Sequence, residues 1–350
     1  MRNSTNRIGA RAMSCAVLAA IVFVSTPAAA DPGDLDPSFD GDGIATTPVR
    51  RAGGYASAVA VQADGRIVLA GPSGDAIALV RFEPDGTLDP TFGADGKVVT
   101  RLGGSGWPVD IAIVDAGLLV ATTVGAPESA RIVIALYRPH GGLDPTFGTD
   151  GTTTIHFKEG AYASEIALQR DGRILVAGTA VRTGDSRPAL EERFALARLT
   201  SDGHLDPTFG GDGKVTTAVQ GQSSRASSVG VSSRGILAVG SMAPHRTGRV
   251  AAARYTFGGK LDPGFSGDGV FVRALAERGT SARGNSVAFD RQGRAVIAAS
   301  AFDLDSFAQV AGLIRLRTGG TLDHSFAADG VLVTGAIHAA SAVEIQSKNT

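Results

Sequence analysis

Leu88-Asp-Pro-Thr-Phe-Gly-Ala-Asp-Gly96 is one of six copies of a phrase that runs through the chain. The phrase begins with Leu-Asp, places Phe four residues after the Leu, and ends in Asp-Gly before a β-branched run. The copies begin at residues 35, 88, 143, 205, 261 and 322, so that successive starts lie 53, 55, 62, 56 and 61 residues apart. A period of roughly 40 to 60 residues built from short strands is typical of a β-propeller.

One unit, from residue 47 to residue 100, predicts four strands at 58–61, 67–70, 77–82 and 97–100. Asp64-Gly65 supplies the hairpin turn between the first two strands, because Gly accepts a positive φ. Many strands are apolar at consecutive residues, which indicates burial on both faces, as in blades stacked face to face. The same order predicts strands at 109–114, 118–122, 132–137 and 152–157; at 165–168, 174–177, 194–199 and 214–219; at 228–231, 236–240, 250–255 and 270–275; and at 286–289, 295–299, 312–316 and 331–334.

Both ends of the repeat region are partial. Residues 44–47 predict a fourth-type strand with no blade before it, and residues 342–346 predict a first-type strand with nothing after it. We therefore predict an all-β propeller with five four-stranded blades plus a partial sixth. The alternatives are a six-bladed ring with one thin blade, in which one terminus completes the other's blade, and a truncated chain with an exposed edge.

Residues 1–30 have the pattern of a signal peptide. Three arginines precede an apolar stretch at 12–24, and Ala28-Ala29-Ala30 gives a small-residue cleavage pattern. A retained anchor is the alternative. Residues 31–350 then form a single propeller domain, which we expect to be secreted or held at the cell envelope. No later stretch is apolar for long enough to span a bilayer, so we expect no membrane span after cleavage.

The cysteine content and the charge balance of the sequence limit how the fold is stabilised and which partners it can bind. The only cysteine, Cys15, lies in the signal segment, so the mature chain cannot form disulfides and must be stabilised by packing and closure. Removal of three arginines from 33 basic residues leaves 30, against 34 acidic residues. That balance predicts no nucleic acid or anionic membrane as partner. We expect a monomer.

The phrase has a structural interpretation. Pro stiffens the link between blades and makes the preceding Asp extended, and that Asp can accept N–H groups in an Asx turn. The sixth copy has His324 in place of Pro. The Phe is expected to be an apolar plug between neighbouring blades, at Phe39, Phe92, Phe147, Phe209, Phe265 and Phe326.

An Arg stands seven residues before the Leu in four units, at Arg81, Arg198, Arg254 and Arg315. In the second unit, which we expect to be shorter here, Arg138 is displaced. An Arg repeated beside an Asp predicts a structural ion pair at each blade junction. The functional alternative is a ring of arginines that grips an anionic ligand.

The pattern LDPxFGxDG, at 88–96, 143–151 and 205–213, is followed by hairpins such as 166–178. This pattern resembles the delta-60 repeat family of secreted or surface bacterial proteins. The resemblance covers residues 35–346. It implies a propeller-like fold and no settled activity.

Calcium is the sharpest chemical hypothesis. Asp36, Asp40 and Asp42 cluster at a tight turn, as hard cations require. However, the residue equivalent to Asp40 is Gly, Ser or Ala in the other copies, and no acid fills the later positions of an EF-hand loop. Turn formation is therefore the alternative for these aspartates, and we predict no other cofactor.

Catalytic motifs are absent from the sequence. The six histidines show no HxxxH or HxH spacing, no serine lies in GxSxG, and no phosphate-binding GxxxxGK[ST] occurs. We predict no catalytic residue. Trp107 and Tyr162 precede first-type strands, and Tyr55 occupies the same place. These aromatics either fill blade edges or provide a stacking platform for sugar rings.

Strand parity separates two ends of the propeller. The Asp-Gly hairpins and the phrases fall at one end, and the loops that vary between units, such as 101–108 and 179–193, fall at the other. Repeat proteins usually vary on their binding face. We therefore predict a non-enzymatic binding or scaffold module for protein or surface glycan. The alternative is an extracellular hydrolase or lyase with its site in the central channel.

Overall fold

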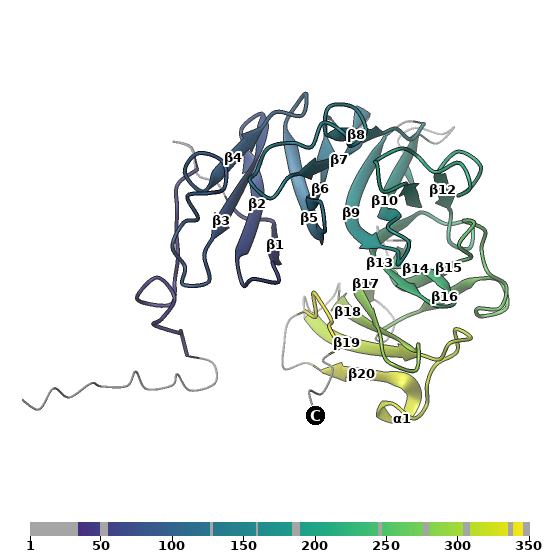
Figure 1. Cartoon of the computed structure of the whole chain (residues 1–350). Helices are drawn as coiled ribbons and strands as arrows, with labels where there is room; N and C mark the ends of the chain where they lie inside the picture. The colour runs from purple at the N-terminus through teal and green to yellow at the C-terminus, as the bar shows by residue number, and fades with distance from the viewer. Residues whose placement is uncertain are drawn as a thin grey trace, which may run out of the picture.

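A computed structural model describes residues 34–49, 55–126, 129–158, 160–183, 190–243, 247–275, 280–303, 309–334 and 339–345. These residues form five four-stranded antiparallel sheets, which follow one another in an arc (Figure 1). Within each sheet the strand order is the chain order, and each sheet is one blade. The prediction of an all-β propeller with four-stranded blades is confirmed.

The strands lie where the sequence predicts them, but the first strands of the second to fifth blades begin three to six residues earlier than predicted. The prediction that Trp107 and Tyr162 precede first-type strands is therefore wrong, because both residues lie within these longer strands. The strands are β1 (Ala58–Val61), β2 (Ile67–Ser73), β3 (Ala76–Phe82) and β4 (Lys97–Thr100) in blade 1; β5 (Gly106–Val114), β6 (Gly117–Val124), β7 (Arg131–Tyr137) and β8 (Thr152–Ile155) in blade 2; β9 (Ala161–Leu168), β10 (Ile174–Thr183), β11 (Leu190–Leu199) and β12 (Lys214–Thr217) in blade 3; β13 (Ser224–Ser232), β14 (Gly235–Met242), β15 (Arg249–Tyr255) and β16 (Val270–Arg273) in blade 4; and β17 (Thr280–Phe289), β18 (Ala295–Asp303), β19 (Gln309–Leu316) and β20 (Val331–Thr334) in blade 5.

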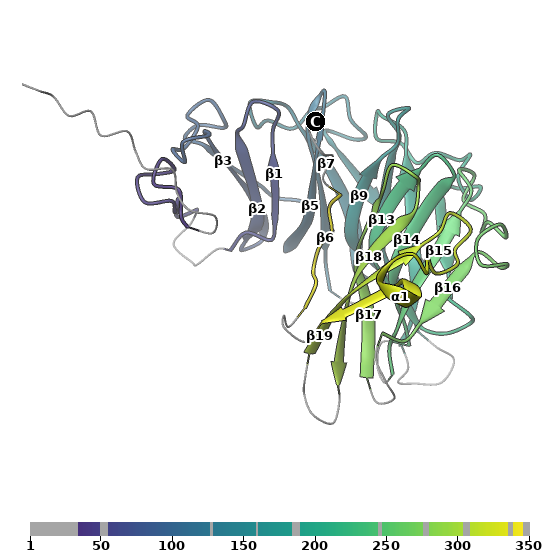
Figure 2. The same ribbon diagram turned by 90° about the horizontal axis from the view of Figure 1, so that it is seen from below.

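The hydrophobic core lies between successive blades. In β10, Leu175 and Ala177 join the cluster shared with blade 4, whereas Ile174 and Val176 join the cluster shared with blade 2. This alternation follows from the strand period of two residues. It explains why the middle strands are apolar at consecutive residues. Figure 2 shows the blades following one another from blade 1 to blade 5.

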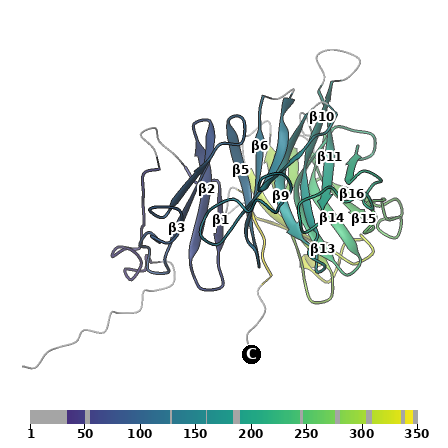
Figure 3. The same ribbon diagram turned by 45° about the horizontal axis from the view of Figure 1, so that its top comes forward.

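The first strand of each blade is the innermost one. β1, β5, β9, β13 and β17 contact one another in that order. Each of the last four carries a β-bulge at a matching position, such as Ala163 to Glu165 in β9 and Ala226 to Ser228 in β13. Turns and loops gather at the two ends of these strands (Figure 3). Because the sheets are antiparallel, hairpins and phrases share one end, as the parity argument predicted.

The partial sixth blade does not form as predicted. Residues 44–47 and 342–345 are described but belong to no strand, and residue 346 lies outside the described residues. The physical reason is that, among the described residues, no strand lies beside either segment to take up its hydrogen bonds. In Figure 1 the arc is open between blade 1 and blade 5.

Two further predictions concern the ends of the chain. The predicted signal peptide at 1–30 lies outside the described residues. Within the part of the chain that the structure describes, no helix has the length and apolar content needed to cross a bilayer. The one described helix, α1 (Ala327–Gly330), is a single turn in the sixth phrase.

Candidate functional site

Each of the first five phrases docks onto the blade that follows it. The backbone N–H after the plug Phe donates to a carbonyl in the next blade, as from Gly93 to His140 at 2.8 Å and from Gly148 to Asp202 at 2.8 Å. The first phrase does the same from Asp40 to Asp85 at 2.7 Å. The repeated phrase is thus the joint between blades.

The predicted plug is confirmed at the four inner joints, where Phe92, Phe147, Phe209 and Phe265 are buried. Each ring meets a turn glycine of the next blade. At Gly203, φ is +89° and an added Cβ would lie 2.9 Å from the Phe147 ring. Only glycine therefore suits both the turn and the plug. Phe39 and Phe326, at the outermost copies, are only half-buried.

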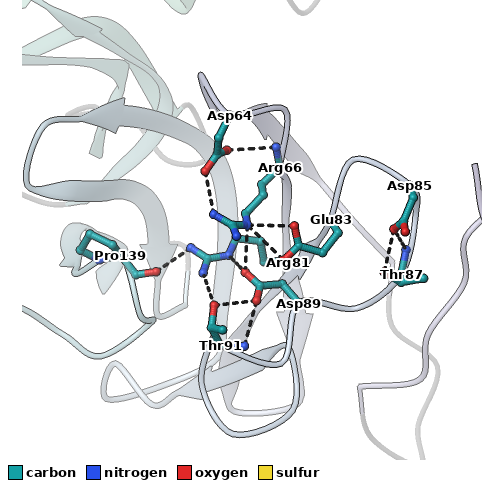
Figure 4. Close-up of polar contacts among 9 residues, drawn as sticks. All are labelled: Asp64, Arg66, Arg81, Glu83, Asp85, Thr87, Asp89, Thr91 and Pro139. Carbon is teal, nitrogen blue, oxygen red and sulfur yellow. Dashed lines mark hydrogen bonds and ion pairs between the residues drawn. The ribbon is translucent and has the colours of Figure 1, made fainter.

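The predicted Arg–Asp ion pair is also confirmed. Arg81 Nε lies 2.6 Å from Asp89 Oδ2, and its Nη1 donates to the carbonyl of Pro139 in the next blade at 2.5 Å (Figure 4). The same guanidinium lies 4.5 Å above the Phe92 ring. The equivalent Nε–Oδ2 distances are 2.9 Å for Arg198–Asp206, 2.8 Å for Arg254–Asp262 and 2.8 Å for Arg315–Asp323.

A second arginine at three joints was not predicted. Arg66, Arg173 and Arg294 reach the same aspartates from the hairpin turns, at 3.4 Å, 2.8 Å and 3.1 Å. The sequence signal was the Arg that follows the hairpin Gly, as in Asp64-Gly65-Arg66. Parity explains the meeting, because hairpins and phrases lie at the same end.

The second blade corrects one expectation. This unit is not shorter before its phrase: Tyr137 bridges Leu143 as Phe82 bridges Leu88, with the same spacing. Leu136 occupies the place of the repeated Arg. Arg138 supplies the charge from two residues later, at 3.2 Å from Asp144, and is more exposed than the other joint arginines.

The proposed calcium residues make turn contacts. Asp36 Oδ1 accepts from the hydroxyl and the N–H of Ser38, which lower the pKa of Asp36, and Asp42 Oδ1 accepts from the N–H of Ile44. Within the described ranges, no group of three or more His, Cys, Asp or Glu is placed to hold a metal ion. Calcium at Asp36, Asp40 and Asp42 stays a prediction.

Carboxylates on the innermost strands were missed by sequence reasoning. Asp110 Oδ2 accepts the N–H of Ile166 in the next blade at 2.8 Å, and Glu165 Oε2 accepts that of Val229 at 2.5 Å. Burial raises the pKa of both groups, and the charge of Asp110 adds to the effect on Glu165. Both residues follow β-bulges, which a single sequence does not reveal.

Five side chains occupy equivalent positions at the loop-rich end of the innermost strands: four share one strand register, and the fifth, Tyr55, stands three residues before β1, where its carbonyl meets Gly71 as that of Tyr162 meets Gly178. We call them the rim residues, and they are Tyr55, Trp107, Tyr162, Arg225 and Arg283. Tyr55 and Trp107 are 55% and 56% exposed, with ring centroids 6.4 Å apart at an interplanar angle of 48°. Aligning the repeats would have revealed the two arginines.

The rim therefore changes character around the arc. Blades 1 to 3 present aromatic rings, and blades 4 and 5 present exposed guanidinium groups. Aromatic faces stack on apolar faces of flat ligands, and guanidinium groups bind carboxylates and sulfates. This arrangement can bind a ligand, and it contains no nucleophile paired with a base.

Comparison with protein families supports the repeat fold. The family model described as "Domain of unknown function (DUF5122) beta-propeller" matches residues 62–92 and 169–209. Both segments run from the hairpin of a blade to the Phe of its phrase, in blades 1 and 3. The match supports a propeller repeat, and the delta-60 resemblance stays an expectation.

Solved structures give weaker similarities, and no curated protein matches the chain. A thermostable family-43 glycoside hydrolase is 12% identical over 79% of this chain and 94% of that chain, with a TM-score of 0.41. A protein of unknown function from Dyadobacter fermentans is 14% identical over 80% and 83%, with a TM-score of 0.45. PQQ-bound aldose sugar dehydrogenase from Streptomyces coelicolor is 16% identical over 79% and 93%, with a TM-score of 0.40. At these TM-scores the similarities carry no argument about function.

Proposed function

We propose that the chain is a non-enzymatic binding propeller, secreted or held at the cell envelope, and that its ligand is a glycan. The observation that carries this proposal is the exposed pair of Tyr55 and Trp107. Large aromatic side chains are usually buried, and each exposed ring leaves apolar area in water. A sugar ring that stacks on the pair would remove that area from water.

The structural difference between the two ends of the propeller supports the proposal. The end with the phrases is built from repeated ion pairs and plugs that join neighbouring blades. The opposite end carries the rim residues and the loops that differ between blades. The rim residues therefore take no part in the repeated ion pairs that make the phrases alike.

Affinity electrophoresis through gels that contain soluble glycans tests the proposal. We expect Trp107→Ala and Tyr55→Ala each to lower the affinity for the glycan, as measured from the retardation, by about tenfold, because one stacking contact contributes roughly 1–2 kcal/mol. Phe257→Ala is the matched control, since Phe257 is a 44% exposed aromatic at the opposite end. If the unmodified chain binds a protein but none of the glycans, the proposal of a glycan ligand is wrong and the binding module has a protein partner instead.

A hydrolase or lyase is the second candidate, because Asp110 and Glu165 are neighbouring carboxylates with raised pKa values. However, Ser228 accepts the N–H of Val287 at 3.1 Å in the same way, which favours a structural role for all three side chains. Glycan cleavage that disappears in Glu165→Gln would favour the enzyme. Binding without any cleavage product would favour the binding module.

A further inference from the structure

A pocket of about 460 Å³ lies at the rim between blades 4 and 5. Its polar lining includes the rim residues Arg225 and Arg283 and four serines: Ser227, Ser241, Ser281 and Ser300. None of the described residues that line it is acidic. The volume falls within the range of small-ligand sites and suits one or two sugar residues.

The positive charge of the pocket comes mainly from one of its two arginines, Arg283. Arg225 Nε lies 2.5 Å from Glu192 Oε2, so this guanidinium is held in place by a carboxylate from blade 3. Arg283 is exposed, and no ion pair involves it within the described part of the chain. Its charge is the one offered to a ligand.

The hydroxyl groups are oriented by the same strands. Ser241 is the strand partner of Arg225, and Ser300 is the strand partner of Arg283, so each blade presents one guanidinium beside one hydroxyl. Asn285 Nδ2 donates to Ser300 Oγ at 2.9 Å and to the carbonyl of Ala340 at 2.6 Å. Because Ser300 Oγ accepts from Asn285, its own proton is directed elsewhere and can be donated to a ligand.

Blades 2 and 3 show what differs at this register. There the strand pairs are Trp107 with Thr123 and Tyr162 with Thr179. A hydroxyl therefore recurs in all four blades, while the rim residue changes from an aromatic ring to a guanidinium. A guanidinium attracts negative charge, whereas an aromatic ring packs against apolar faces.

We propose that this pocket binds the acidic group, a carboxylate or a sulfate ester, of an anionic glycan. The inference rests on the proposed function, because the same glycan is held at Tyr55 and Trp107. Guanidinium donors and hydroxyl donors match the acceptor oxygens of both groups, and hydrogen bonds to a charged group are the stronger kind.

Titration calorimetry with oligogalacturonate, dextran sulfate and neutral dextran tests the inference. Arg283→Gln should weaken binding of the acidic ligands by about tenfold and leave neutral dextran unchanged. The control is Arg234→Gln, an exposed Arg in the hairpin of blade 4 at the opposite end. High salt should reduce the difference between acidic and neutral ligands. If Arg283→Gln weakens binding of oligogalacturonate alone, the pocket binds a carboxylate, and if it weakens binding of dextran sulfate alone, the pocket binds a sulfate ester.

Failure of the pocket and failure of the platform give different results. If Arg283→Gln and Arg234→Gln bind the acidic ligands with equal affinity while Trp107→Ala loses glycan binding, the proposed pocket is wrong and the proposed function stands. Loss of acidic ligands in Arg283→Gln, with full binding in Trp107→Ala, would keep the pocket and overturn the aromatic platform. An unmodified chain that binds none of the three ligands would contradict both.

Discussion

Arg198 Nε lies 2.9 Å from Asp206 Oδ2, and the two side chains are 5% and 4% exposed. The same guanidinium lies 4.8 Å above the Phe209 ring and donates to the carbonyl of Phe257 in the next blade. One arginine thus connects its own strand, the phrase and the following blade. The repetition of the phrase is explained by this joint, because every blade boundary needs the same contacts.

Removal of the buried charge should destabilise the propeller. Asp206→Asn keeps an acceptor for Thr208 but leaves Arg198 without its carboxylate, so we expect a loss of about 3–5 kcal/mol in the free energy of unfolding. Asp144→Asn is the matched control, since Arg138 is 42% exposed there, and should cost under about 1 kcal/mol. Urea denaturation measures both, and equal losses would contradict the structural role of the buried pair.

The plug residues should differ between inner and outer joints. Phe209→Ala removes a ring buried between blades 3 and 4 and should cost about 3–5 kcal/mol. Phe326→Ala, in the sixth phrase, removes a half-buried ring that no described blade follows, and should cost roughly 1 kcal/mol. Thermal or urea unfolding measures both variants, and an equal loss of stability in Phe326→Ala and Phe209→Ala would contradict this prediction.

Acid should weaken the joints. Burial raises the pKa of Asp206, but hydrogen bonds from Thr208 and Arg173 and the charge of Arg198 outweigh burial and bring the pKa to about 2. The unfolded chain, with an Asp pKa near ~3.9, then binds the proton more tightly, so this stabilisation is full above about pH 5 and is lost as the pH falls from about 4 to 2.

Urea midpoints between pH 6 and pH 2 measure this effect. The unmodified chain should lose stability steeply below about pH 4, and Asp206→Asn should show a shallower decline. Parallel curves for the two proteins would show that Asp206 does not contribute to the pH dependence.

Glu165 should have the opposite dependence. Burial and the charge of Asp110 raise its pKa in the folded chain, so stability is lost as the pH rises from the unfolded value through the folded one. Glu165→Gln keeps an oxygen that can accept the N–H of Val229. We expect this variant to melt above the unmodified chain at pH 7 and to lose that advantage near pH 4. A lower melting temperature at pH 7 would contradict the prediction.

The sequence predicted the features that depend on local pattern and repetition. Strands such as β3 follow from apolar runs, and Arg81 with Asp89 follows from two residue types that recur at a constant spacing. The second arginine, Arg66, required knowledge that the hairpin and the phrase meet in space. Parity places the hairpin and the phrase at the same end of the propeller, but it does not reveal that Arg66 Nε lies 3.4 Å from Asp89 Oδ2.

Other features depend on neighbours that the local sequence does not name. Asp110 and Glu165 act across blade boundaries after β-bulges, and the alternating pattern that predicts a strand does not place a bulge. Residues 44–47 and 342–345 have strand-like composition but pair with no strand in the described part of the chain, so propensity alone was a wrong guide there.

The intrinsic fluorescence of Trp107 tests the central claim most directly, because Trp107 is the only tryptophan in the chain. It is 56% exposed, so a glycan that stacks on it should shift the emission to shorter wavelength and protect it from acrylamide quenching. We predict a saturable shift whose midpoint equals the calorimetric dissociation constant. A glycan that binds by calorimetry and leaves both the emission and the quenching unchanged would contradict the account.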